Sequence, residues 1–424
     1  MLQKRRIQQI DAPSRQGYDA IFNAKFLEDI PDAVSQWQSH RIMLVASKGL
    51  AANSDRISRL QETLGSKLVH TKLGVRTHTP YADVRDIAIN IQKHNIDCVI
   101  SVGSCSYSDA CKIASLLANN LPSDFSVDDM ESLVDKDRGI ADSRNGSPLQ
   151  PRQCKLLVVP TSLSASEWNA VSSATNSQGK KQHFGLWDQG QPDLILLDPE
   201  LASTSPEDLW LSSGVRCIDH CVELMCNPLS SEKGYEGVNV HAEEGLKCMV
   251  AGLTEYKQAK GKGESGSQDE DHDLLLKGIS ECQFGSREAL TGLLIWRVPM
   301  GPSHAIGHQL GSVAKVMHGI TSCIMLAPVL RWQLDNLKNP HYQQSQARIR
   351  DIFNNTLGWQ EVTASDAIEK FVKSLGLPSK LSEVNVTSDK EVRKIADKTM
   401  TDVWGGGKRQ MELEDLLTVL NSAR

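Results

Sequence analysis

The chain has 424 residues, of which 40% are hydrophobic and 23% charged, and its formal net charge at pH 7 is -6. This composition excludes a disordered, collagen-like or coiled-coil protein, and the length allows two or three domains with buried cores. Without an excess of positive charge we expect no nucleic-acid partner, and no apolar stretch approaches the ~20 residues that span a bilayer. The N-terminus lacks the apolar core of a secretory signal, and the ten cysteines form no CxxC pair. We therefore expect a cytoplasmic protein with reduced thiols.

The first half of the chain alternates β-branched runs with amphipathic stretches of helix length. The predicted strands are Arg41–Ser47, Lys67–Lys72, Asp97–Gly103, Lys155–Thr161 and Asp193–Asp198. The predicted helices are Asn53–Leu64, Ala82–His94 and Asp109–Ala118. This alternation predicts a parallel sheet with helices on both faces, and ligands of such sheets bind beyond the carboxyl ends of the strands. The loops after Ser47, Gly103 and Pro160 are therefore candidate binding loops.

From about Pro206 the strand runs end, and apolar residues recur at spacings of three and four. The predicted helices are Glu207–Met225, Ala242–Tyr256, Arg287–Arg297, Ser303–Ala314, Ser322–Leu337, Gln343–Leu357, Ala364–Leu375, Lys390–Thr399 and Met411–Ser422. We predict an α/β domain with a Rossmann-like parallel sheet over residues 1–205 and an all-α domain over residues 206–424, with the active site in the cleft between them. The polar segment 257–273 is expected to be a solvated loop between helices, and the segment 135–151 a surface excursion that interrupts the sheet domain.

The strongest local signal is the segment Gly301–Gly319, GPSHAIGHQLGSVAKVMHG. His304 and His308 are four residues apart, so on a helix they project from one face. His318 follows beside a glycine, where a helix can end and return toward the same side. Such a group of histidines is typical of a metal site or a catalytic cluster, with packed or surface histidines as the alternative.

A second group lies in the segment Ser213–Glu223, SGVRCIDHCVE. On a helix, Arg216 and His220 share one face, and Asp219 and Glu223 share a neighbouring one. His220 is therefore a candidate to join the other three histidines. The structural alternative is that Arg216 only pairs with an acidic residue of its own helix, in an exposed ion pair.

Two further segments directly follow predicted strands. Gly103–Lys112, GSCSYSDACK, is a turn of small residues that opens a helix, and such a turn presents backbone N–H groups and the positive helix end to a phosphate. Pro160–Trp168, PTSLSASEW, supplies hydroxyl groups suited to a nucleotide or a polar substrate. Ordinary helix N-caps in the first segment and a serine-rich turn in the second are the alternatives that the residues leave open.

Five segments, taken in order, resemble motifs of the iron-type alcohol dehydrogenase superfamily: GSCSYSDACK, PTSLSASE, PDLILLDPEL, SGVRCIDHCVE and HAIGHQLG…HG. This superfamily also contains the maleylacetate reductases and is structurally akin to dehydroquinate synthase. The resemblance extends from about Phe22 to Ser422, and GPSHAIGHQLG followed by HGITSC is most similar to the maleylacetate reductase-like branch. It implies a dehydroquinate synthase-like fold, in which a dinucleotide-binding domain precedes a helical domain.

The resemblance also implies roles for single residues. The pyrophosphate of NAD(P)H would lie against Gly103, Ser104, Ser106 and Asp109. The adenosine half of the cofactor would lie against Thr161, Ser162 and Leu201. Three of the family's four metal ligands would be His220, His304 and His318. His308 would lie beside the nicotinamide and the substrate, in a proton-relay or positioning role.

Two positions depart from the family pattern. The fourth metal ligand of the dehydrogenases is an aspartate four residues before the first histidine, and this position is Arg216 here. A guanidinium has no lone pair to donate and repels a cation, so we predict that no metal is bound, as is understood for the maleylacetate reductases. In the phosphate turn, two of the family's three glycines are replaced by Ser104 and Cys105, whose side chains would crowd the dinucleotide.

The sequence therefore predicts a metal-independent NAD(P)H-dependent reductase of a polar carbonyl or unsaturated carboxylate substrate. In the predicted catalytic cluster of His220, His304, His308, His318 and Arg216, the arginine binds a substrate carboxylate or polarises a carbonyl, and His308 donates the proton. The alternative is a redox-silent relative that catalyses isomerisation, elimination or cyclisation by histidine acid–base chemistry, and a binding protein without activity is a third hypothesis. We expect a small-molecule substrate, and a homodimer as the form of the protein.

Overall fold

The computed structural model describes residues 2–7, 19–144, 146–186, 189–261, 268–402, 404 and 407–424. The chain divides into two compact units, Met1–Ser205 and Pro206–Arg424. Within the described residues, no helix is both long and apolar enough to cross a membrane. The first unit combines strands with helices and the second is helical, as the predicted fold class requires.

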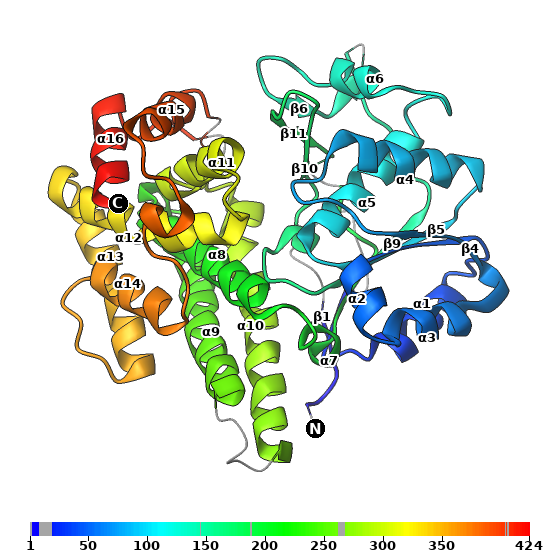
Figure 1. Ribbon diagram of the computed structural model, residues 1–424, viewed down its shortest axis with the longest axis horizontal. Helices are drawn as coiled ribbons and strands as arrows, with labels where there is room; N and C mark the ends of the chain where they lie inside the picture. The colour runs from blue at the N-terminus through cyan, green and yellow to red at the C-terminus, as the bar shows by residue number, and fades with distance from the viewer. Residues whose placement is uncertain are drawn as a thin grey trace. The chain divides into compact units, whose positions relative to one another are not determined.

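The first unit is organised around a sheet that has seven strands among its described residues (Figure 1). These strands are β1 (Arg5–Ile7), β2 (Ala20–Phe22), β3 (Ile42–Ala46), β4 (Leu68–Leu73), β5 (Cys98–Gly103), β9 (Lys155–Pro160) and β12 (Leu194–Leu197). Their order is β1-β2-β12-β9-β5-β3-β4, and every neighbouring pair is parallel except β1 and β2. The predicted parallel sheet and its five predicted strands are thus confirmed.

Helices cover both faces of this sheet (Figure 1). The helices of the unit are α1 (Phe26–Gln36), α2 (Lys48–Asn53), α3 (Arg56–Leu64), α4 (Tyr81–Lys93), α5 (Cys105–Ala118), α6 (Val127–Ser132) and α7 (Pro199–Ala202). Alternate residues of β3 point to opposite faces, so Met43 and Val45 pack with α4 and α5, whereas Ile42 and Leu44 pack with α1 and α3. Because the strands are buried on both faces, their sequences are almost continuously apolar.

The sheet places three loops at one edge. From β3 the chain crosses to β4 on one side and then to β5 on the other, so the topological switch lies between β3 and β5. Ser47 follows β3, and its backbone N–H donates to the Val102 carbonyl at 2.9 Å. Thr161 follows β9, and its N–H donates to the Gly103 carbonyl at 2.9 Å. The three predicted loops therefore lie together at the carboxyl edge, where open α/β sheets bind ligands.

Short strands add a smaller sheet to the first unit. They are β6 (Ile140–Ala141), β10 (Ser172–Thr175) and β11 (Lys181–Phe184), with a separate hairpin of β7 (Ser143–Arg144) and β8 (Ser147–Pro148). Residues 135–151, which we expect to form a surface excursion, contribute three of these short strands. Ile140 and Ala141 within this segment are buried and pair with β11.

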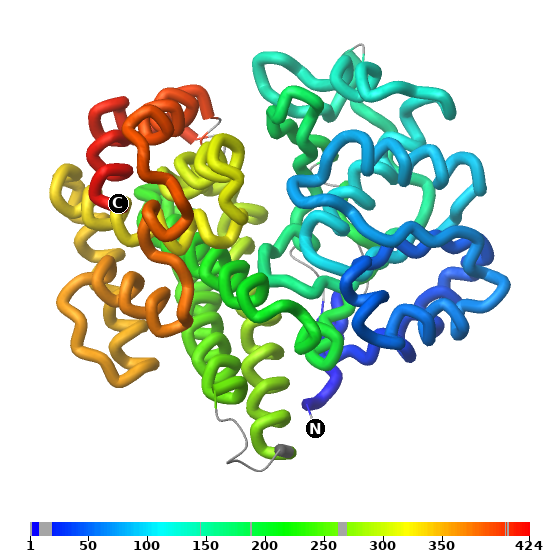
Figure 2. The backbone as a smooth tube through the Cα atoms, viewed as in Figure 1, coloured from blue at the N-terminus to red at the C-terminus, as the bar shows by residue number. Residues whose placement is uncertain are grey.

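The second unit is helical. Its helices are α8 (Glu207–Cys226), α9 (Glu236–Gly261), α10 (Gln268–Trp296), α11 (Pro302–Ala314), α12 (His318–Asn336), α13 (Pro340–Leu357), α14 (Ala364–Ser374), α15 (Asp389–Thr399) and α16 (Leu413–Ser422). Helices α9 and α10 lie side by side (Figure 2). A Cβ atom added to Gly252 or Gly278 would lie 2.6 or 2.7 Å from the carbonyl oxygen of the other glycine. The two backbones approach this closely because both residues lack a side chain.

The polar segment 257–273 does not form the loop that its composition predicts. Helix α9 continues to Gly261 and α10 begins at Gln268, so the described part of the segment is helical. Residues 262–267 lie outside the described residues. The remaining helices of this unit match the predicted ranges to within a few residues.

Candidate functional site

The predicted catalytic residues of the second unit lie on three helices. Helix α8 contributes Arg216 and His220, α11 contributes His304 and His308, and α12 begins with His318. Helix α8 is buried over most of its length, and α11 starts with Pro302, a residue that favours the first helical position. Polar side chains on the facing surfaces of these helices are therefore removed from water and contact one another.

The rings of the four predicted histidines lie next to one another in the order His220, His304, His308 and His318. The ring centres of His220 and His304 are 4.8 Å apart and the rings are stacked. His308 lies 6.5 Å from His304, edge to face, and stacks on His318 at 6.1 Å. His220 and His304 are buried, whereas the side chain of His308 is 21% exposed. The structure thus brings together all four histidines that the sequence singled out.

Arg216 lies within this cluster and is 2% exposed. Its Nη1 donates to the Ser322 hydroxyl at 3.0 Å and lies 3.6 Å from Asp219 Oδ2. The same carboxylate oxygen accepts hydrogen bonds from Ser303 at 2.9 Å and from Ser322 at 2.5 Å. The ion pair within α8 that was the structural alternative does form, but it is buried, and the expectation of an exposed pair is wrong.

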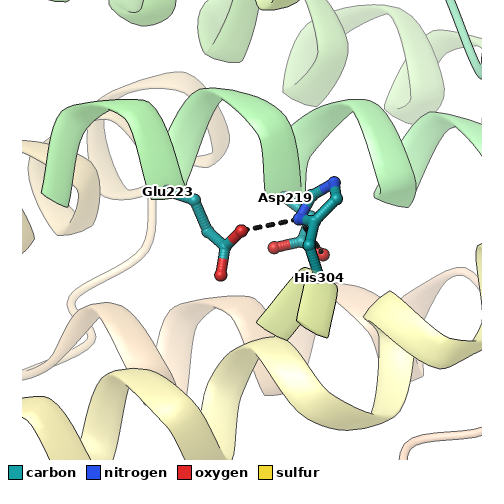
Figure 3. Close-up of side chains that lie close together, drawn as sticks. All are labelled: Asp219, Glu223 and His304. Carbon is teal, nitrogen blue, oxygen red and sulfur yellow. Dashed lines mark hydrogen bonds and ion pairs between the residues drawn. The ribbon is translucent and has the colours of Figure 1, made fainter. Parts of the chain in front are cut away.

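Glu223 joins α8 to the start of α11 (Figure 3). Its Oε2 accepts from the backbone N–H of Gly301 at 2.7 Å and lies 2.6 Å from His304 Nδ1. Its Oε1 accepts from the N–H of Ser303 at 2.6 Å. A carboxylate at a helix N-terminus satisfies N–H groups that have no partner within the helix. Glu223 therefore fixes both α11 and the orientation of the His304 ring.

Burial dominates the electrostatics of the cluster. Burial raises the pKa of Asp219 to about 6, although Arg216 opposes this shift. Burial and the neighbouring Asp219 raise the pKa of Glu223 well above its ordinary value. Burial and then the charge of Arg216 lower the pKa values of His220 and His304 well below the ordinary value, so both imidazoles are neutral at pH 7.

Asp219, Glu223 and His304 are the residues to test as metal ligands. One possible donor atom from each of them lies within 4.8 Å of the other two. Both oxygens of Glu223 already accept backbone hydrogen bonds, and His304 Nδ1 contacts Glu223. Among the buried side-chain atoms without a hydrogen-bond partner in the described part of the chain are Asp219 Oδ1, His220 Nδ1 and His304 Nε2. A cation that used the two imidazole nitrogens would lie beside the Arg216 guanidinium, which cannot be a ligand. The residues present therefore do not fit the iron site that the resemblance implies for its dehydrogenases.

The predicted cofactor residues of the first unit lie around the start of α5. Ser104 is the N-cap of this helix, and the Cys105 N–H donates to the Ser162 hydroxyl at 3.2 Å. A Cβ atom at Gly103 would lie 2.6 Å from the Tyr107 ring, so glycine is required there. Ser106, in the first turn, accepts at its carbonyl from Thr79 Oγ1 at 3.4 Å. The positive end of α5 thus lies at the switch-point edge of the sheet, as a dinucleotide site requires.

The Cys105 side chain, which the sequence predicts to crowd the dinucleotide, contacts the loop after β9. Burial and the nearby Asp109 raise the pKa of its thiol to about 11, and a hydrogen bond with Ser164 acts in the opposite direction. The thiol is therefore protonated at pH 7 and turned toward the loop after β9. The Ser104 side chain, at the N-cap of α5, makes no capping hydrogen bond to this helix.

A buried network joins α5 to the loop after β9. Lys112 Nζ donates to the carbonyl oxygens of Ser166 and Asn169 at 2.5 and 2.9 Å, and Ser166 Oγ donates to Asp109 at 2.5 Å. Burial raises the pKa of Glu167 in the same loop to about 7. Asp109 therefore helps to hold the loop that carries Thr161 and Ser162. This structural role is separate from the pyrophosphate contact predicted for it.

Leu201 differs from the other predicted cofactor residues. It lies in α7, is completely buried, and packs in the apolar core between the sheet and α1. The structure thus groups Gly103, Ser104, Ser106 and Ser162 at the start of α5, with Leu201 inside the core. Three residues of the site had no role predicted from the sequence: Ser322 contacts Arg216, Asp402 contacts His308, and Ser303 contacts Asp219.

Comparison with known proteins agrees with these features. Residues 18–199 match the family model "iron-containing alcohol dehydrogenase", and residues 283–424 match the C-terminal model of the same family. Dehydrogenase ALT3 of Alternaria alternata is 28% identical over 394 residues, which are 86% of this chain and 93% of that protein. Maleylacetate reductase of Burkholderia cepacia is 22% identical, over 85% of this chain and 78% of that protein.

Solved structures share the fold over nearly the whole chain. The NADH-dependent butanol dehydrogenase A of Thermotoga maritima superposes with a TM-score of 0.74 at 16% identity, over 96% of each chain. Together the two family matches cover more than half of the sequence and confirm the resemblance inferred from the motifs. The chain belongs to the iron-containing alcohol dehydrogenase family and is an oxidoreductase of that family.

Proposed function

We propose that this dehydrogenase is a metal-independent reductase that uses NAD(P)H to reduce a polar carbonyl compound or an unsaturated carboxylate. The observation that carries the proposal is Arg216, a buried guanidinium among the histidines, at the position where the family resemblance places a carboxylate ligand. Its charge is already present where a metal cation would otherwise act. The similarity to maleylacetate reductase, although only 22% identical, supports the same substrate class.

The first unit would hold the dinucleotide, which supplies a hydride when bound. The N-terminus of α5 presents backbone N–H groups and the positive end of the helix dipole, and both favour a pyrophosphate. The Lys112 network holds the neighbouring loop in place, which keeps the hydroxyl of Ser162 beside those groups. Ser104 is then the side chain that limits how closely a pyrophosphate approaches.

The second unit would bind and protonate the substrate. Arg216 attracts a carboxylate or polarises a carbonyl oxygen. Because its charge is buried away from water, it interacts more strongly with the substrate than it would in a medium of high dielectric constant. His220 and His304 are neutral and contribute hydrogen bonds without adding charge. His308, which is partly exposed, donates the proton that the reduced substrate oxygen or carbon requires, and regains it from water.

Two measurements test the proposal directly. Titration of the purified protein with NADH and NADPH, by fluorescence or calorimetry, should show binding of at least one of them. Turnover of keto acids and aldehydes with that cofactor should survive exhaustive treatment with EDTA. Near one iron or zinc ion per chain, with activity lost on its removal, would refute the metal-independent mechanism.

Two substitutions test the assigned residues. Arg216→Lys keeps the charge but loses the planar guanidinium, so a carboxylate-binding role predicts a raised KM, and a polarising role predicts a fall in kcat of about 10²-fold or more. His308→Gln should lower kcat by about 10²–10⁴-fold with little change in substrate binding. Circular dichroism and a thermal melt verify that each variant is folded. If both variants keep wild-type kinetics, the catalytic site lies elsewhere.

The redox-silent alternative is favoured by one observation, the replacement of two turn glycines by Ser104 and Cys105. In that case the neutral His220 and His304 would serve as acid and base for isomerisation, elimination or cyclisation. Absence of dinucleotide binding, both in the wild type and in a variant with glycine restored at both positions, would select this alternative.

A further inference from the structure

Asp402, which lies just beyond α15, contacts the histidine to which we assign proton transfer. Its Oδ2 lies 3.4 Å from His308 Nδ1 and accepts from Gln309 Nε2 at 2.8 Å. The side chain of Asp402 is 6% exposed. Because the two residues are separated by 94 positions in the sequence, the fold alone brings them together.

The carboxylate of Asp402 is held from its other side as well. Its Oδ1 accepts from the backbone N–H of Trp404 at 3.0 Å. The Trp404 ring is buried, and its Nε1 donates to the Thr399 carbonyl at 3.1 Å, which fastens the segment to the end of α15. Each oxygen of Asp402 thus has a protein donor, and the direction of the carboxylate toward α11 is fixed.

This arrangement determines which nitrogen of His308 carries a hydrogen. Burial alone would raise the pKa of Asp402. The hydrogen bond and charge of His308, together with hydrogen bonds from the Trp404 N–H and Gln309, hold this pKa below its ordinary value, so the carboxylate is ionised at pH 7. An ionised carboxylate only accepts hydrogen bonds, and the contacting Nδ1 must therefore be the protonated one. The carboxylate also stabilises the imidazolium form when Nε2 gains a proton.

We propose that Asp402 is a positioning residue for the reduction, which holds His308 as the Nδ1–H form and leaves Nε2 as the atom that transfers the proton. This inference rests on the proposed role of His308. Bound NAD(P)H would supply the hydride for the substrate carbon. The imidazolium form of His308 gives its Nε2 proton to the substrate oxygen and becomes the neutral Nδ1–H form, in which the Nδ1 hydrogen still lies against Asp402. A proton from the solvent then restores the imidazolium at Nε2 before the next turnover.

The first test uses the wild-type full-length protein labelled with ¹⁵N-histidine. Long-range ¹H–¹⁵N correlation spectra distinguish the two neutral forms of each imidazole, and the signals of His308 are those that disappear in His308→Gln. The expected result is a protonated Nδ1 on His308 that is lost or mixed in Asp402→Asn. A wild-type His308 that carries its hydrogen on Nε2 overturns the proposal, whatever the activity of the variants.

The second test separates turnover from binding. Asp402→Asn should lower kcat about tenfold or more while KM changes less than twofold, and Asp402→Glu should recover part of the loss. The matched control is Asp397→Asn on α15. The exposed carboxylate of Asp397 pairs with Arg393 on the same helix, and this variant should leave kcat unchanged. Equal thermal melts of the variants verify that they are folded.

The outcomes distinguish this inference from the function on which it rests. If His308→Gln loses turnover and Asp402→Asn keeps it, the role of Asp402 is refuted and the reductase stands. If the Nδ1–H form depends on Asp402 but neither variant changes kcat, the positioning contact is real and the assignment of His308 as the proton donor fails, and with it the catalytic role of Asp402.

Discussion

Gly319, the second residue of α12, is where we expect a single methyl group to cost the most stability. A Cβ atom built there would lie 2.5 Å from the carbonyl carbon of Ser212 and 2.6 Å from its carbonyl oxygen. Ordinary van der Waals contact begins at 3.4 Å. The substitution Gly319→Ala therefore requires α8 and α12 to separate by roughly 1 Å at this point, since backbone atoms cannot rotate away.

The expected magnitude follows from two opposing effects. Overpacking a buried contact costs about 1–3 kcal/mol and more when backbone must move, whereas alanine is favoured over glycine in a helix by about 1 kcal/mol. Because backbone atoms must move here, the overpacking cost should lie at the upper end of this range, and the net loss in the free energy of unfolding should be about 2 kcal/mol. For a domain of this size, each 1 kcal/mol lowers Tm by about 2–4 °C. His318 and Ser322 lie on the displaced turns, so kcat should fall as well.

Urea denaturation followed by tryptophan fluorescence measures this loss. The control is Gly311→Ala in α11, where the nearest atom to an added Cβ is the Val316 carbonyl oxygen at an ordinary 3.5 Å. This variant should be as stable as the wild type or slightly more stable. If Gly319→Ala unfolds at the same urea concentration as Gly311→Ala, the close approach of α8 and α12 described above is refuted.

Two further predictions concern the first unit. Ser104→Gly should tighten NADH or NADPH binding more than Cys105→Gly does, because the Cys105 thiol is turned toward Ser164. Calorimetric titration of the two variants measures their affinities, and equal effects would contradict this orientation of the thiol. Glu167 has a pKa of about 7 when folded and an ordinary value of 4.5, so the folded state binds more protons between these values. Unfolding free energy should therefore decrease by about 3 kcal/mol as pH rises through this window, and Glu167→Gln should remove that decrease in urea melts at pH 5 and pH 7.5. Identical pH dependence of the two proteins would show that Glu167 is not responsible.

The strands were predictable because burial on both faces demands nearly continuous apolar sequence. β5, CVISVG, and β12, LILL, are completely buried and could be recognised without their neighbours. The start of α10 could not, because the residues of Gln268–Asp273 are polar and charged, as in a solvated loop. Its helical form follows from continuity with the apolar residues that pack against α9, a tertiary effect that local composition does not contain.

The candidate site was predictable to the extent that helical spacing determines contacts. His304 with His308, and Arg216 with Asp219, lie one turn apart, and spacing alone places each pair on neighbouring surfaces. Asp402 was not predictable, because it follows α15 in a segment with no motif and meets His308 only through the packing of α11 against α15.

The charges of the cluster assign different tasks to its histidines. Arg216 is a fixed positive charge, and its nearest counter-charge, Asp219, is the carboxylate whose pKa burial raises to about 6. A second positive charge on His220 or His304 would be buried beside that guanidinium, so these imidazoles stay neutral and provide shape and hydrogen bonds. His308 is partly exposed and contacts the carboxylate of Asp402, whose pKa remains low. His308 thus combines access to water with a neighbouring carboxylate, and we expect the catalytic proton to enter and leave the cluster there.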